Sequence, residues 1–169
     1  MAKQTDPRLV QAMNAIASGQ PQQAESLCLS ILSEKKRDDL AMALLAQVYN
    51  STGKYVDAIQ LIRSAISKNN KRADYHGLLG DMLTTKGDFR KALDAYNKAS
   101  ELYPENVELL FWGAVILCTD DKFDIAKPMF EKIFKVDSDL REMVPRLENH
   151  PMFPLSEEMV KKILDITNE

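Results

Sequence analysis

The side chains that could carry acid–base or metal chemistry are few and scattered along the sequence. Two histidines, His76 and His150, and two cysteines, Cys28 and Cys118, are the only imidazoles and thiols. None has Cys, His, Asp or Glu neighbours at the spacing of a metal site. The sequence also lacks a phosphate-binding loop, a nucleophile elbow and an HExxH motif. We therefore predict no enzyme activity, no cofactor and no metal, and only an active site assembled from distant residues stays open.

The bulk properties of the sequence exclude several other classes of function. The net charge of −3 disfavours a nucleic-acid partner, which requires a dense basic footprint. The longest apolar run, residues 109–118, is about half a membrane span. The N-terminal stretch MAKQTDPRL contains no apolar signal segment. Both cysteines are interpreted as small buried hydrophobic residues in a reducing compartment, so a cytoplasmic location is expected.

One stretch, residues 73–106, has the pattern of a self-contained pair of helices. Leu79, Gly80 and Leu83 recur at helical spacing, and Gly80 leaves room for a neighbouring helix. Gly87 suits the end of the first helix and Asp88 can cap the second. Pro104 then ends the second helix, because proline cannot continue it. The stretch predicts two helices whose apolar stripes need further helices to cover them.

The same pattern recurs four times, at steps of 34 residues. A small residue suited to a helix crossing stands at positions 24, 58, 92 and 126, and all four are alanine. The turn position holds glycine at 19, 53 and 87 and aspartate at 121. The small residue of the first helix stands at 12, 46, 80 and 114. Several columns in phase over four units indicate a helical repeat protein.

The repeated unit resembles the tetratricopeptide repeat, a family with a 34-residue period. His76 stands where the family has tryptophan, and Leu83 where it has its first tyrosine. The resemblance implies an all-α fold, a right-handed superhelical array of four helix–turn–helix units with C-terminal capping helices. We expect one domain, 1–169, with repeats at 5–38, 39–72, 73–106 and 107–140 and a cap at 141–169.

The cap is expected because the repeat pattern stops after the fourth unit. Ser156 is placed to cap a last amphipathic helix, with Leu155 and Val160 as a hydrophobic staple. A terminal repeat needs a cover with a polar outer face, although a membrane-surface or partner-binding helix has a similar pattern. The first helix of the fourth unit is apolar nearly all round, so something must cover it. The candidates are the C-terminal segment, a second copy of the chain or a bound peptide.

The family resemblance implies that the first helices of the units line a concave groove that binds ligands. The groove would be apolar at both ends and acidic in the middle. This suits a protein or peptide ligand with basic and apolar residues. The Lys and Asn residues of the family's clamp for heat-shock chaperones are missing, so that partner is not expected. The partner-binding candidates are Leu9, Met13, Ala43, Gln47, Asn50, Asp74, Asp81, Phe111, Trp112 and Val115.

Two basic clusters, residues 35–37 and 68 with 71–72, lie at successive unit junctions and are expected on one edge of the array. Solvated loop charge is the default interpretation, and a weak site for an acidic partner is the other.

Three hypotheses for function follow from the sequence. The first is a non-catalytic scaffold or adaptor that holds a peptide or protein segment, which includes small chaperones of bacterial secretion systems. The second is a regulatory or substrate-presenting module of a larger enzyme such as a transferase. A chain complete at Glu169 would favour the first, and a longer gene the second. The third is self-assembly into a homo-oligomer through the fourth unit or the C-terminal helix.

Overall fold

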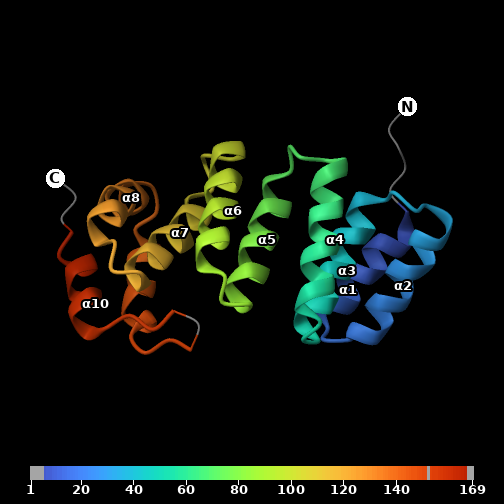
Figure 1. The fold of residues 1–169 in the computed structure, drawn as a ribbon, viewed down its shortest axis with the longest axis horizontal. Helices are drawn as coiled ribbons and strands as arrows, with labels where there is room; N and C mark the ends of the chain where they lie inside the picture. Colours follow the sequence, from blue (N-terminus) through green and yellow to red (C-terminus); the bar gives the residue numbers. More distant parts are fainter. Residues whose placement is uncertain (1–5, 152, 167–169) are drawn as a thin grey trace. The chain divides into compact units, whose positions relative to one another are not determined.

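A computed structural model describes residues 6–151 and 153–166, and most of these residues are helical (Figure 1). Short turns join successive helices, and an isolated bridge between Glu148 and Leu155 is the sole β-type pairing in these ranges. The all-α fold predicted from the sequence is confirmed. The helices are α1 (Pro7–Ala17), α2 (Pro21–Glu34), α3 (Asp39–Ser51), α4 (Tyr55–Lys68), α5 (Ala73–Thr85), α6 (Phe89–Leu102), α7 (Val107–Thr119), α8 (Phe123–Val136), α9 (Asp139–Met143), the 3₁₀ helix η1 (Val144–Leu147) and α10 (Glu157–Leu164).

The turns inside the helix pairs depend on a left-handed backbone conformation. Gly19, Gly53 and Gly87 have φ values of +66°, +82° and +84°. Glycine adopts this conformation without the steric cost that a Cβ atom brings. Asp121 occupies the same position before α8 with φ of +55°, as one of the few residue types that tolerate it. The turn positions predicted from the 34-residue spacing are therefore the ones that reverse the chain.

Side-chain caps begin several helices, although one predicted cap is wrong. Asp6 accepts a hydrogen bond from the backbone N–H of Arg8, and Ser156 accepts one from that of Met159 at 3.1 Å. Asp88 stands before α6 but makes no capping hydrogen bond. Its carboxylate instead pairs with the ammonium of Lys91 at 2.5 Å. A lysine three residues further along competes successfully for the oxygen that would otherwise cap the helix.

The small residues of the repeat lie where helices pack. Ala24, Ala58, Ala92 and Ala126 are each 0% exposed, as the crossing positions require. Contacts join α1 to α2, α3 to α4 and α7 to α8, and also α2 to α3 and α6 to α7. A methyl group at the crossing lets two helix backbones approach closely, so a larger side chain there would force them apart.

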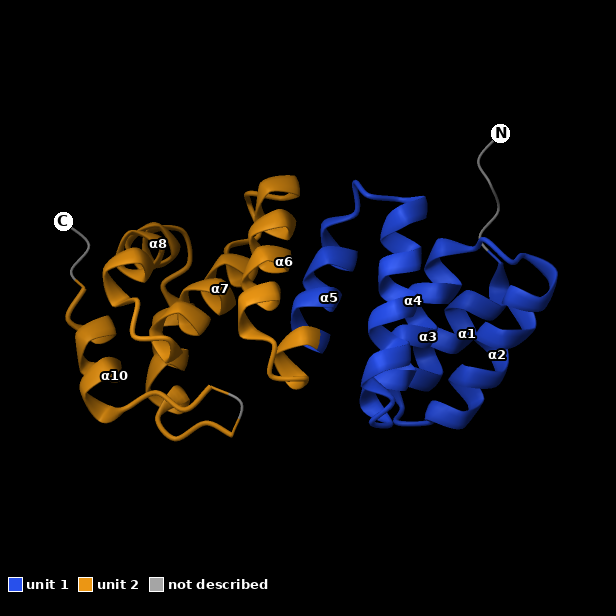
Figure 2. Cartoon of the chain, in the orientation of Figure 1, with its two compact units in different colours: residues 1–82 blue, residues 83–169 orange. Residues whose placement is uncertain are grey.

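The chain divides into two compact units, residues 1–82 and residues 83–169 (Figure 2). Unit 1 contains α1 to α4 and the beginning of α5, and unit 2 contains the rest. Each unit is described by itself below. Within the described ranges, none of the helices combines the length and the apolar character that crossing a membrane requires.

Candidate interaction surface

The histidines serve structural contacts where the structure places them. His76 Nε2 lies 3.3 Å from the carbonyl oxygen of Asn70. His150 Nδ1 accepts a hydrogen bond from the backbone N–H of Phe153 at 3.3 Å, and the two rings stack. No cluster of three or more His, Cys, Asp or Glu side chains that could hold a metal ion occurs in ranges 6–151 and 153–166. Each histidine therefore fastens a turn.

The two cysteines are free and buried, as predicted. Burial raises the pKa of Cys28 to about 11, with a smaller contribution from the charge of Asp38. Burial alone raises the pKa of Cys118 to about 12. The thiolate is the reactive form of cysteine, so neither side chain is activated as a nucleophile near neutral pH.

Three of the predicted partner-binding residues form a row across the first helices of unit 1. Met13 on α1, Gln47 on α3 and Asp81 on α5 are separated by steps of 34 residues. Met13 is 50% exposed, Gln47 is half-buried and Asp81 is exposed. Contacts join α1 to α3, and the Tyr75 hydroxyl on α5 donates to Asp39 on α3 at 3.1 Å. We call Met13, Gln47 and Asp81 the first-helix row.

Two further predicted residues belong to the same helices of unit 1. Asn50 lies one turn after Gln47 on α3, and its buried Oδ1 atom has no hydrogen-bond donor among the described residues. Asp74 is exposed on α5 and pairs with Arg72 at 2.6 Å. The hydrogen bond from Arg72 holds the pKa of Asp74 below its usual value. This surface of unit 1 therefore carries amide, carboxylate and thioether groups.

The structure buries four of the other predicted residues. Leu9 packs in a hydrophobic cluster with Ala12, Cys28 and Ile31 of α1 and α2. Ala43 is buried on α3, and Phe111 and Val115 on α7 are 0% exposed. These side chains help to hold the helices in place, and a ligand cannot reach them without a conformational change.

Aromatic contacts explain the burial of α7. The ring of Phe111 meets that of Phe130 on α8 edge-on, with centroids 5.9 Å apart. The half-buried Trp112 stacks on Phe153, which follows η1 in the C-terminal segment. Of the three covers considered for this helix, the contact in the structure is with the chain's own C-terminal segment.

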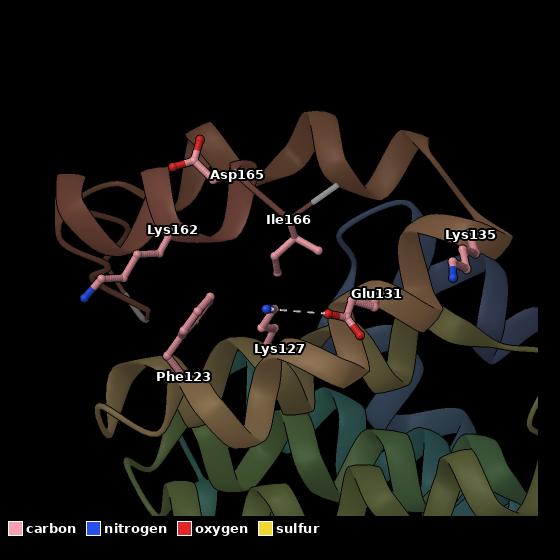
Figure 3. Close-up of a pocket in the computed structure, with 7 residues that line it drawn as sticks. All are labelled: Phe123, Lys127, Glu131, Lys135, Lys162, Asp165 and Ile166. Atoms are coloured by element: carbon pink, nitrogen blue, oxygen red, sulfur yellow. Dashed lines mark ion pairs between the residues drawn. The ribbon is translucent and has the colours of Figure 1, made fainter. Parts of the chain in front are cut away.

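Unit 2 also contains two hollows that the repeat pattern did not reveal. One, of about 980 Å³, lies between α6, α7 and the C-terminal segment, with Phe89, Leu93, Ile116, Pro151 and Pro154 in its wall. The other, of about 550 Å³, lies between α8 and α10 (Figure 3). Lys127 and Glu131 form an exposed ion pair of 3.9 Å in its wall. The sequence signals were the two prolines and the short last helix, but neither repeats with the 34-residue period.

These features define a helical-repeat scaffold of the kind that mediates protein–protein interactions. Tetratricopeptide repeat models match residues 15–82 and residues 73–106. The chain belongs to the tetratricopeptide repeat family, and the resemblance found in the sequence is thereby confirmed. No curated protein sequence matches the chain.

Several solved structures share the fold at low sequence identity. PilF of Pseudomonas aeruginosa superposes with a TM-score of 0.75 and 20% identity, over 95% of this chain and 73% of that one. YrrB, a TPR protein with an unusual peptide-binding site, gives 0.71 and 20%, over 96% of this chain and 86% of its own. A mutant O-GlcNAc transferase of Thermobaculum terrenum gives 0.71 and 23%, over 76% of this chain. The chain spans 25% of that transferase structure.

Proposed function

We propose that the chain is a non-catalytic scaffold that binds a protein or peptide segment along the first-helix row of unit 1. The observation that carries this proposal is the order of exposed groups in that row. An apolar side chain on Met13, an amide on Gln47 and a carboxylate on Asp81 follow one another on successive first helices. A segment laid across these helices would meet one chemically different contact at each step.

The amides of α3 would hold the backbone of the bound segment. An amide side chain offers both donors and an acceptor, which match the C=O and N–H groups of an extended peptide. The Asn50 Oδ1 atom is buried without a donor among the described residues, and such an atom gains from an incoming N–H. Gln47, three residues earlier, lies on the same face of the helix.

The carboxylates of α5 would select basic residues in the ligand. Asp74 and Asp81 lie two turns apart on one face of α5, and both are exposed. The ion pair between Asp74 and Arg72 is itself exposed, so little free energy opposes an exchange of its partner. An apolar residue beside the basic one would pack on Met13. The ligand class is therefore a peptide with basic and apolar residues.

The finer assignments from the sequence remain parts of this proposal. They include the division into four repeats and a cap, and a cytoplasmic location, which the two buried free cysteines support. A role as a transferase module finds support in the fold of the O-GlcNAc transferase, but identity of 23% extends the likeness to the fold alone. A secretion-type chaperone and a homo-oligomer are alternatives that the same experiment addresses.

The proposal can be tested with peptides selected from a random phage-displayed library. Binding of a selected, fluorescently labelled peptide is measured by anisotropy for wild type and for Asn50→Leu and Asp81→Lys. Each variant should weaken binding by about tenfold or more, because each removes a partner that the peptide then lacks. The selected peptides should be enriched in Lys or Arg next to apolar residues.

Controls on α4 separate a specific surface from general effects. Gln60→Leu and Asp57→Lys make the same chemical changes at exposed positions of a second helix. Equal losses in both pairs of variants would refute the first-helix row, as would selected peptides that are predominantly acidic. Far-UV circular dichroism verifies that each variant stays folded.

A further inference from the structure

The connections between successive helix pairs of unit 1 carry a concentration of basic side chains. The α2–α3 connection contains Lys35, Lys36 and Arg37, and the end of α4 with its connection to α5 contains Lys68, Lys71 and Arg72. Arg37 and Lys71 are one repeat apart, so the two loops present a cation at the same place. We call the four exposed cations Lys36, Arg37, Lys68 and Lys71 the basic edge.

Hydrogen bonds place these two connections beside each other. Asp39, the first residue of α3, accepts a hydrogen bond from the Tyr75 hydroxyl at 3.1 Å. The Asn69 side chain at the end of α4 also donates to Asp39, at 3.4 Å. Both connections lie at the upper side of unit 1 in Figure 1. The cations of the basic edge therefore belong to one continuous surface.

The acidic side chains at this edge are already engaged. Asp6 is bound by Arg8 and Lys35, and Glu34 by Arg8, at 2.7–3.0 Å. Asp38 caps α3, and its oxygen accepts from the backbone N–H of Ala41 at 2.9 Å. Asp39 binds Tyr75 and Asn69, and Asp74 binds Arg72. No ion pair within the described part of the chain engages Lys36, Arg37, Lys68 or Lys71. The edge has a surplus of positive charge although the chain as a whole is at −3.

The two connections are short and internally fastened. The backbone N–H of Asp38 donates to the carbonyl of Lys35, and that of Tyr75 donates to the carbonyl of Arg72. The guanidinium of Arg72 also lies 4.6 Å from the centre of the Tyr75 ring. The α2–α3 connection borders a hollow of about 620 Å³, which leaves room for an incoming side chain. A ligand would thus find these cations held on ordered backbone, which reduces the entropy lost on binding.

We infer that the basic edge binds an acidic segment of a partner protein, with carboxylates that bridge the two connections. Nucleic acid is a poorer fit, because four cations interspersed with carboxylates fall short of the dense footprint that a phosphate backbone requires. A membrane surface is also a poorer fit. The connections hold only charged and amide side chains, so no apolar residue stands ready to enter the lipid. The inference does not depend on the first-helix row.

The probe is a short fluorescein-labelled oligo-glutamate peptide, and binding to the full chain is followed by anisotropy at low and high salt. We compare wild type with Lys36→Glu/Arg37→Glu and with Lys68→Glu/Lys71→Glu. Each double variant should weaken binding by about tenfold or more at low salt, since two favourable charge contacts become repulsive. The matched control is Lys86→Glu/Lys132→Glu, which changes the net charge equally at exposed positions in unit 2. The control should lose less than half of the affinity.

Three results would overturn the inference. The first is an equal loss in the control, which would mean that only net charge matters. The second is an absence of binding by wild type at low salt. The third is tighter binding of a single-stranded oligonucleotide or of phosphatidylserine vesicles with the same dependence on the four cations. Peptides selected on the first-helix row should bind the edge variants normally, so failure here leaves that proposal standing.

Discussion

The indole of Trp112 stacks on the phenyl ring of Phe153, with ring centroids 5.2 Å apart and planes 26° from parallel. Trp112 lies on α7, and Phe153 belongs to the segment between η1 and α10. Phe111 approaches the other side of the same indole edge-on, at 5.3 Å. Offset-stacked and edge-to-face geometries are the favourable ones for aromatic pairs. This contact joins the C-terminal segment to the last regular helix pair.

Removal of the Phe153 ring should therefore expose α7. Phe153 is 3% exposed, and Phe153→Ala should cost about 3–5 kcal/mol of unfolding free energy, as for other buried phenylalanines. Trp112 is the only tryptophan, so its emission should move to longer wavelength as water reaches the indole. Urea unfolding followed by fluorescence measures both effects. Tyr103→Ala, which removes an aromatic ring that is 49% exposed in the same unit, should change neither.

A second prediction concerns the helix crossings. Ala92 on α6 is 0% exposed, and Ala92→Leu inserts three carbon atoms into a packed contact. Overpacking of this kind should destabilise the protein by about 1–3 kcal/mol. Thermal unfolding followed by circular dichroism would show a lower melting temperature. Ala17→Leu, at an exposed position at the end of α1, is the control and should have little effect. Equal melting temperatures for wild type and Ala92→Leu would contradict the crossing role.

The repeat period explains why the sequence predicted so much of the fold. Residues such as Ala58 and Gly53 are constrained by one local geometry, a close crossing and a left-handed turn, and that geometry recurs in each helix pair. The capping role of Asp88 was wrong because Lys91 offers its carboxylate a competing partner. A rule about a single position cannot weigh such a competition.

The candidate site was less predictable, because exposure depends on contacts outside the repeat. The column that holds Met13 in the first unit stays open, but Phe111 and Val115 in corresponding first-helix columns are closed. Phe130 packs directly on Phe111, while the C-terminal segment, which follows no period, covers the neighbouring Trp112 through Phe153. The hollow walled by Pro151 and Pro154 arises from the same segment. The basic edge, in contrast, could be predicted because its residues lie at the repeated junctions.

The ion-pair cluster at the start of α1 should make unit 1 sensitive to acid. Hydrogen bonds from Arg8, and secondarily from Lys35, hold the pKa of Asp6 well below its ordinary value of 3.8. A group whose pKa is lowered by folding stabilises the folded state above its unfolded-state pKa, and this contribution is lost as the pH falls through the folded-state pKa. The same sign applies to Glu34, whose pKa is lowered chiefly by Arg8. The stabilisation should therefore be complete at neutral pH and decline progressively below the ordinary carboxyl range.

The substitution Asp6→Asn isolates the charge, because asparagine can still accept the capping hydrogen bond from the Arg8 N–H. At neutral pH the variant should open α1 more readily than wild type does, since the pairs with Arg8 and Lys35 lose their negative partner. The difference should shrink as the pH falls below 3.8, because wild type then becomes protonated at the same site. Hydrogen exchange of the α1 amides at a series of pH values measures this. Asp94→Asn, at an exposed carboxylate on α6, is the control and should leave the exchange of α1 unchanged at every pH. A deficit in Asp6→Asn that persists undiminished at low pH would mean that the charge of Asp6 is not its source.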